Sequence, residues 1–150
     1  MKPKDSINKN YQEAENGMEV PPVKPELVAL FKYLKTESPS KIIISTVEDT
    51  VFLEVEEILH ISGSSNYSTF YLTGGEKIMA SKGLKYFEGI LPENKFFRTH
   101  QSHLINLRFI KRIWHQDGIV VLSNGDQVPL ARTRKNDLIE KIKLLFKIST

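Results

Sequence analysis

The spacing of apolar residues changes twice along the chain, from a helical period to a strand period and back to a helical one. In residues 24–35 the large apolar side chains recur every three or four positions, at Leu27, Leu30, Phe31 and Leu34. This spacing predicts a short amphipathic helix with Pro25 in its first turn, where proline is favoured. Residues 1–22 are polar and end in "VPP", which predicts a flexible lead. We therefore expect residues 1–37 to be a flexible lead or linker with one short helix, and residues 38–150 to be the folded domain.

From Lys41 onward the apolar positions fall in short runs rich in β-branched and aromatic residues. Runs such as "KIIISTV", "TVFLEV", "ILHISGS" and "YSTFYLT" are typical of strands. The dipeptides "DG" at 117–118 and "NG" at 124–125 are strong signals for tight turns between strands. Together these runs and turns predict about ten short strands.

Two stretches of this region return to a helical spacing, "KGLKYFEGIL" and "TRKNDLIEKIKLLFKI". The first places Leu84, Phe87, Ile90 and Leu91 on one face, and the second carries an apolar stripe of Leu138, Ile139, Ile142, Leu145 and Phe146. We expect both to form short helices at the edges of the domain. The predicted fold is therefore mainly β, with antiparallel sheets arranged as a sandwich or roll rather than a doubly wound sheet.

Composition sets limits on the class of protein. Of 150 residues, 40% are hydrophobic and 26% are charged, which indicates one folded domain with a tail. Cysteine is absent, which excludes disulfides, thiolate metal sites and cysteine nucleophiles. No apolar run approaches the roughly 20 residues of a membrane helix, and the N-terminus has no apolar signal core. We expect a cytoplasmic protein without a membrane partner.

Charge is unevenly distributed along the chain. Residues 1–37 hold six Lys and six acidic residues and are neutral, whereas residues 101–150 hold nine Lys or Arg and four acidic residues, a net charge of +5. A basic C-terminal region favours an anionic partner such as nucleic acid or acidic lipid. A solvated basic face with no partner is the alternative interpretation.

The stretch "FFRTHQSHLIN", residues 96–106, first suggests an active site or a metal site. However, the chain has neither GxGxxG nor GxxxxGK[ST], and "SGSSN" lacks the GxSxG spacing of a hydrolase nucleophile. In an extended segment, His100 and His103 would point to opposite faces, and no HExxH motif accompanies them. We therefore expect no enzymatic activity, cofactor, metal site or small-molecule substrate.

Nucleic-acid binding fits the polar residues better, because they gather at three junctions between predicted elements. The first junction, "SGSSNYS", contains Asn66 and Tyr67, and the second, "RTHQSH", is expected to form a polar loop. The third, "LARTRK", precedes the last helix. Asn, Gln and Arg pair with base edges, whereas Ser, Thr and Lys hold phosphates. A β scaffold could present all three junctions on one side.

Four segments carry a resemblance to a known family: "VFLEVEEILHISGSSNYSTFYL", "KGLKYFEGIL", "FFRTHQSHLINLRFIKRI" and "IVVLSNGDQVPLARTRKNDLIEKI". In this order and spacing they resemble the LytTR family, the DNA-binding domains of bacterial transcription regulators and of response regulators in two-component signalling. The resemblance covers residues 41–145. It implies an elongated fold of antiparallel sheets whose loops, rather than a recognition helix, enter successive major grooves of double-stranded DNA.

The resemblance also assigns candidate DNA-binding residues. Carried over position by position, these are Asn66 and Tyr67, then His100 and Gln101, then Arg132 and Arg134. Arg98, Ser102 and Lys135 lie in the same loops and are included. Two roles are open for Arg98 and His100, ordering the loop or contacting DNA.

Other residues of the second block are predicted to be structural. Asn106 is expected to cap a turn through its neighbours' backbone. We expect the apolar residues of this block to lie in the core, namely Phe96, Phe97, Leu104 and Ile105.

The sequence leaves a second class of function open, a protein-interaction β module in a signalling complex. If DNA is the partner, a second copy would be needed on repeated half-sites. Family members commonly carry a phospho-receiver domain ahead of this one, but residues 1–37 show no receiver pattern. We therefore expect either a stand-alone regulator or a piece of a longer protein.

Overall fold

In this computed structural model, the described residues are 24–28, 30 and 39–146. The chain divides into two units, residues 1–37 and residues 38–150, and each is considered by itself. In the first unit, residues 25–28 and 30 are helical, within the stretch where apolar spacing predicts a helix. The remainder of the predicted lead lies outside the described residues.

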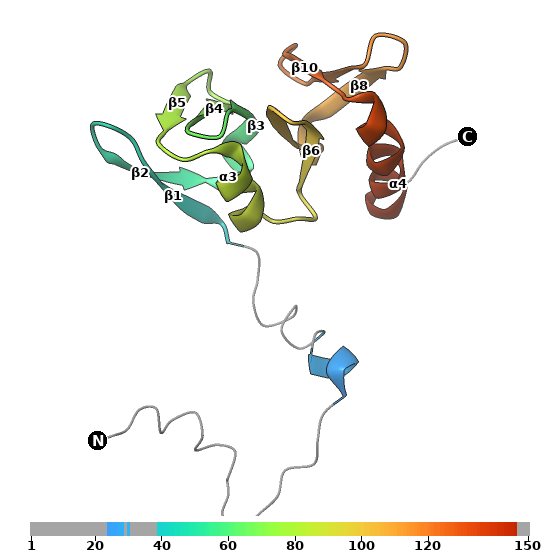
Figure 1. Cartoon of the computed structure of the whole chain (residues 1–150), viewed down its shortest axis with the longest axis horizontal. Helices are drawn as coiled ribbons and strands as arrows, with labels where there is room; N and C mark the ends of the chain where they lie inside the picture. The colour runs from blue at the N-terminus through green and yellow to red at the C-terminus, as the bar shows by residue number, and fades with distance from the viewer. Residues whose placement is uncertain (1–23, 29, 31–38, 147–150) are drawn as a thin grey trace, which may run out of the picture. The chain divides into compact units, whose positions relative to one another are not determined.

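Ten strands form three antiparallel sheets in the described part of the second unit (Figure 1). The strands are β1 (Lys41–Ser45), β2 (Thr50–Glu54), β3 (Ile58–Gly63), β4 (Ser68–Leu72), β5 (Lys77–Ala80), β6 (Phe96–His100), β7 (His103–Asn106), β8 (Ile110–Trp114), β9 (Ile119–Leu122) and β10 (Gln127–Pro129). β1 pairs with β2, the central sheet has the order β5-β4-β3-β7-β6, and the third sheet has the order β10-β9-β8. The predicted mainly β, antiparallel fold is confirmed.

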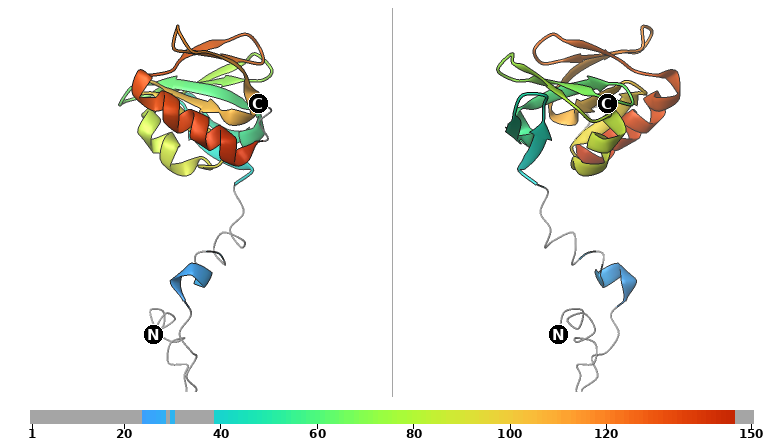
Figure 2. Two further views of the ribbon diagram at one scale, coloured as in Figure 1. Left: turned by 90° about the vertical axis from the view of Figure 1, so that its right-hand side faces the viewer. Right: turned by 60° about the vertical axis from the view of Figure 1, so that its left-hand side comes forward.

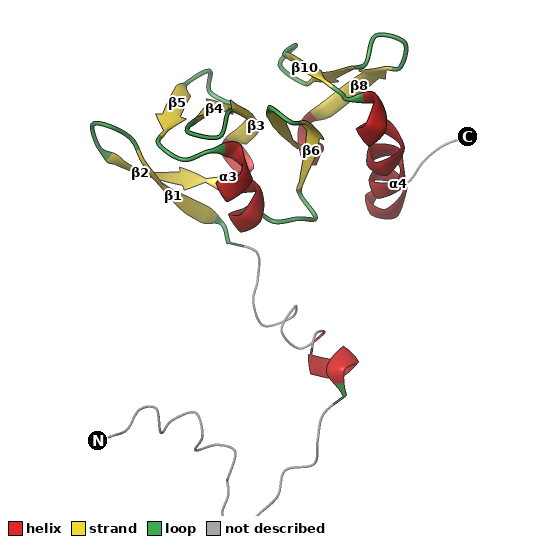
Figure 3. Ribbon diagram, in the orientation of Figure 1, coloured by secondary structure: helices red, strands yellow, loops and turns green. Residues whose placement is uncertain are grey.

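Short helices lie between and after the strands (Figure 3). The α-helices are α3 (Leu84–Ile90) and α4 (Lys135–Leu145), and the 3-10 helices are η1 (Val55–Glu57), η2 (Leu107–Phe109) and η3 (Arg132–Arg134). Both predicted helices of the domain are present. The predicted apolar faces are only partly buried. Leu84, Phe87, Leu91 and Leu138 are buried, whereas Ile90, Leu145 and Phe146 are exposed by 38%, 40% and 47%.

The central sheet separates two hydrophobic cores, because successive side chains of a strand point to opposite faces. On one face, Ile61, Phe70 and Leu104 belong to the core shared with β1, β2 and α3. On the other face, Phe97 and Ile105 belong to the core shared with the third sheet and α4. The views in Figure 1 and Figure 2 show these two groups of elements on opposite sides of the central strands.

The core and the tight turns agree with the sequence pattern. The four residues predicted to lie in the core, Phe96, Phe97, Leu104 and Ile105, are each exposed by 6% or less. Gly118 and Gly125 have φ angles of 63° and 95°, the left-handed region that glycine adopts without strain. The "DG" and "NG" dipeptides therefore form the turns β8–β9 and β9–β10.

Candidate nucleic-acid interface

The loop between β3 and β4, residues 64–67, is the first of the three predicted junctions. It closes on itself through a hydrogen bond of 2.9 Å from the Ser64 N–H to the Tyr67 carbonyl. Asn66 and Tyr67 are exposed, Tyr67 by 51%. Two side chains predicted to contact DNA therefore project from a short, ordered loop.

The start of α3 supports this loop from behind. The Leu84 N–H donates to the Ser64 carbonyl at 3.1 Å. A Cβ at Gly83 would lie 2.4 Å from the Ser65 carbonyl oxygen, far inside van der Waals contact. Glycine at position 83 is therefore what permits the loop to pack directly on the backbone before α3.

The second junction is shorter than the sequence predicts. Instead of a six-residue polar loop, only Gln101 and Ser102 form the turn, and Arg98 and His100 belong to β6 while His103 begins β7. The prediction that His100 and His103 face opposite ways is also wrong. They are register partners on paired strands, with ring centroids 6.0 Å apart, because the chain reverses between them.

Arg98 uses its guanidinium to hold this turn. Its Nε donates to the His100 carbonyl at 3.1 Å, and Nη2 donates to the Gln101 carbonyl at 2.5 Å. Its Nη1 pairs with the Glu88 carboxylate of α3 at 2.6 Å. All three guanidinium nitrogens are engaged within the protein, so of the two roles open for Arg98 the geometry supports ordering the loop.

Ser102 connects the two histidines of the hairpin. Its N–H donates to His100 Nδ1 at 3.1 Å, and its Oγ lies 2.9 Å from that nitrogen and 2.8 Å from His103 Nδ1. Because His100 Nδ1 accepts a hydrogen bond, its Nε2 carries the proton of the neutral ring. Burial, with smaller contributions from the charges of His60 and His100, lowers the pKa of His103 to about 4. These side chains stiffen the turn, from which Gln101 projects exposed.

The third junction, around η3, packs against β6. The Ala131 N–H donates to the Thr99 carbonyl at 2.8 Å, and Arg134 Nε donates to the Arg98 carbonyl at 2.9 Å. Arg134 also pairs with Asp137 at 2.9 Å and lies over the Phe97 ring at 4.5 Å. Arg134 is thereby held on the protein surface.

The neighbouring cations of the third junction are placed differently. Arg132 is exposed and Lys135, the first residue of α4, is half-buried. Among the described residues, neither side chain makes a hydrogen bond or ion pair. Arg132 is therefore the arginine of this junction whose guanidinium is available to an external ligand.

Backbone hydrogen bonds join the three junctions in one row. The Gly63 N–H donates to the Ser102 carbonyl at 3.0 Å, which links the first junction to the second. The bond from Ala131 to Thr99 links the third junction to the same hairpin. The exposed side chains of this row include Asn66, Tyr67, Gln101 and Arg132, together with Ser64, Ser65 and Thr133.

A buried polar contact that no local sequence signal indicates joins the central and third sheets. His60 of β3 is 6% exposed, stacks on Tyr71 at 4.2 Å, and lies 2.9 Å from the Asp126 carboxylate through Nε2. Burial lowers the pKa of His60, although Asp126 opposes this shift. Hydrogen bonds from Asn124 and His60 lower the pKa of Asp126. His60 thus has a structural role. No pattern of neighbouring residues could indicate this role, because its partner Asp126 lies 66 positions away in the sequence.

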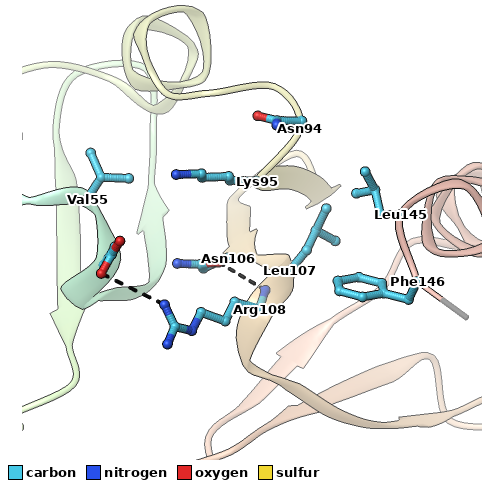
Figure 4. A pocket seen from close by; sticks show the side chains of 9 residues that line it. Val55, Asn94, Lys95, Asn106, Leu107, Arg108, Leu145 and Phe146 are labelled. Carbon is cyan, nitrogen blue, oxygen red and sulfur yellow. Dashed lines mark hydrogen bonds and ion pairs between the residues drawn. The ribbon is translucent and has the colours of Figure 1, made fainter. Parts of the chain in front are cut away.

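A largely apolar hollow of about 310 Å³ lies at the other end of the hairpin (Figure 4). Leu107, Leu145 and Phe146 line it, with Lys95 before β6 and Asn106 at the end of β7. The hollow therefore lies at the end of β6 and β7 away from the Gln101 turn, and none of the candidate DNA-binding residues lines it.

Asn106 has the capping role predicted for it. Its side chain accepts from the Arg108 N–H at 3.0 Å at the start of η2 and donates to the buried Ile58 carbonyl at 2.9 Å. Within the described ranges, no cluster of three or more His, Asp or Glu side chains is arranged to hold a metal ion. Nor is any helix in those ranges both long and apolar enough to span a membrane.

Comparison with known proteins relates this arrangement to a family. The chain is 27% identical to the sensory transduction protein LytT of Bacillus subtilis over 104 residues, 65% of this chain and 42% of that protein. It is 27% identical to LytT of Enterococcus faecalis over 133 residues, 87% of this chain and 51% of that protein. The chain thus spans about half the length of these relatives.

Structure and sequence comparisons agree on the domain. The fold matches a LytTr DNA-binding domain from Bacillus cereus with a TM-score of 0.60 and 19% identity, covering 69% of this chain and 97% of that one. The family model for the LytTr DNA-binding domain matches residues 48–143. The chain therefore belongs to the LytTR family of DNA-binding domains.

Proposed function

We propose that this domain binds double-stranded DNA sequence-specifically, by inserting the three junctions into the major groove, and acts as a bacterial transcription regulator in two-component signalling. One observation carries the proposal. Three segments far apart in sequence are hydrogen-bonded into one row, and each presents an exposed polar side chain. Asn, Gln and Arg are the side chains that form bidentate pairs with base edges in that groove.

The proposal divides the candidate residues into two groups. Asn66, Gln101 and Arg132 read base edges, because their side chains are exposed and make no side-chain hydrogen bond among the described residues. The remaining candidates either contact phosphates or hold the junctions in place, namely Tyr67, Arg98, His100, Ser102, Arg134 and Lys135. The excess of basic residues in 101–150 supports an anionic partner.

The test begins with selection of bound duplexes from a random pool, which should return a recurring motif. Gln101→Ala and Arg132→Ala should each then weaken binding to that motif by about 1–3 kcal/mol. Matched controls are Gln127→Ala on β10 and Arg108→Ala beside the apolar hollow, both exposed and outside the row. Undiminished binding by the Gln101→Ala, Arg132→Ala double variant would refute the assignment.

Salt dependence separates this function from a protein-interaction module in a signalling complex. DNA affinity should fall steeply as ionic strength rises, since phosphate contacts release counterions. An apolar protein interface responds weakly to salt. A motif that repeats at about one or two helical turns, roughly 10–10.5 base pairs each, would indicate a second copy on repeated half-sites.

A further inference from the structure

The turn between β8 and β9, residues 115–118, lies beside the third junction. The N–H of Leu130, which follows β10 and leads into the junction, donates to the Gly118 carbonyl at 2.8 Å. A Cβ at Gly118 would lie 3.1 Å from the Leu130 carbonyl oxygen, so the two segments are in close contact. The turn therefore extends the row of three junctions by one further segment.

A polar groove of about 340 Å³ separates the two segments. His115 and Gln116 line it from the turn, and Arg132 and Lys135 line it from the third junction and α4. Among the described residues, none of these four side chains makes a hydrogen bond or ion pair. By contrast, Arg98 and Arg134 are bonded within the protein, so the donors around this groove are available to an external ligand whereas those two guanidiniums are held.

We propose that this groove binds one phosphate of the DNA backbone, next to the bases read by the third junction, and that the β8–β9 turn is a fourth DNA-contacting segment. The inference rests on the proposed function. The Lys135 ammonium, the His115 imidazole N–H and the Gln116 amide NH₂ line one space, a donor set suited to phosphate oxygens, while the neighbouring Arg132 guanidinium reads the adjacent base. Asp117 also lines the groove and opposes the anion, but two cations outweigh its single carboxylate.

The test uses the duplex recovered by selection, with its phosphates replaced one at a time by uncharged methylphosphonate. For the unmodified protein, methylphosphonate at one position of the DNA next to the third junction should lower the affinity about three- to tenfold. In the His115→Ala, Gln116→Ala variant, the same replacement should lower affinity by a clearly smaller factor, because two of the donors to this phosphate are already gone. Arg108→Ala, an exposed cation outside the groove, should retain the full loss.

Asp117→Asn provides a change of opposite sign. Removing the carboxylate should raise affinity for the unmodified duplex about two- to threefold, and this gain should disappear when the critical phosphate is replaced. The exposed turn tolerates asparagine, so misfolding does not complicate the result.

The outcomes separate this inference from the proposed function. If the unmodified protein shows no sequence-selective duplex binding, the proposed function fails. If it binds selectively but no methylphosphonate position depends on His115 and Gln116, only the fourth contact is overturned. Shifts of the His115 and Gln116 signals on addition of inorganic phosphate, without any methylphosphonate effect, would indicate a free anion and would also overturn it.

Discussion

Replacing Glu88 with glutamine separates two explanations for the DNA-binding turn. Glu88 lies on α3, outside the three junctions, and its carboxylate pairs with Arg98 at 2.6 Å. Arg98 in turn holds the carbonyls of His100 and Gln101. If Arg98 positions Gln101, Glu88→Gln should weaken specific binding. If only charge matters, removing an acidic group should strengthen binding to anionic DNA.

The size of the effect follows from the exposure of the pair. The side chains of Arg98 and Glu88 are 23% and 43% exposed, so solvent screens their interaction. A partly exposed pair of this kind contributes about 0.5–1 kcal/mol. If that energy orders the turn, specific affinity should fall about two- to fivefold. Affinity for a scrambled duplex should stay constant or rise.

The assay compares the selected and scrambled duplexes at one salt concentration by fluorescence anisotropy. Glu93→Gln is the control, because Glu93 is exposed and lies just before the start of β6, at the end of the strand away from the Gln101 turn. In the free protein, the amide signal of Gln101 should broaden or move in Glu88→Gln but not in Glu93→Gln. An equal gain in affinity for both duplexes would refute a positioning role.

Three further changes test the scaffold. Gly83→Ala should displace Ser65, lower the free energy of unfolding by about 1–3 kcal/mol and weaken specific DNA binding. Its control is Gly89→Ala, whose Cβ would meet nothing within 4 Å; thermal unfolding should show this variant to be neutral or stabilised. Asn106→Ala should lower the free energy of unfolding by about 1–3 kcal/mol, because the buried Ile58 carbonyl of β3 loses the hydrogen bond from the Asn106 side chain. Urea denaturation measures this change, and an unchanged midpoint would contradict a structural role for Asn106. The pKa of His103 falls from 6.5 to about 4 on folding, so the unfolded chain binds more protons between these two pH values. The free energy of unfolding should therefore drop by about 1–2 kcal/mol as pH falls through that window. His103→Gln should flatten the dependence of stability on pH, and an unaltered slope would count against this role of His103.

Local patterns in the sequence predict much of the scaffold. The pairs Phe96–Phe97 and Leu104–Ile105 are buried because apolar neighbours in a strand face two covered sides of a sheet. Gly118 and Gly125 mark their turns because tight hairpins require a positive φ. The order of motifs indicates the family. The strands and turns depend on residues close together in the chain, and the family depends on the order of the motifs along it.

The tertiary structure decides which polar side chains remain available for DNA. Arg98 and Arg132 are alike as residue types, yet one is bonded to Glu88 and two carbonyls while the other is exposed. Arg134 is held by the carbonyl of Arg98, which is 36 positions away. The hairpin reversal places His100 beside His103, and the β8–β9 turn reaches the third junction only through sheet packing.

The sequence alone therefore determined most of the strands, the two glycine turns, the four core residues of the β6–β7 hairpin and the family, because these depend on local periodicity and on motif order. Only the tertiary structure decided the role of each polar side chain. Those roles depend on which backbone carbonyls and carboxylates come within hydrogen-bond distance, about 3 Å, once remote segments have packed together. No pattern of neighbouring residues encodes that distance.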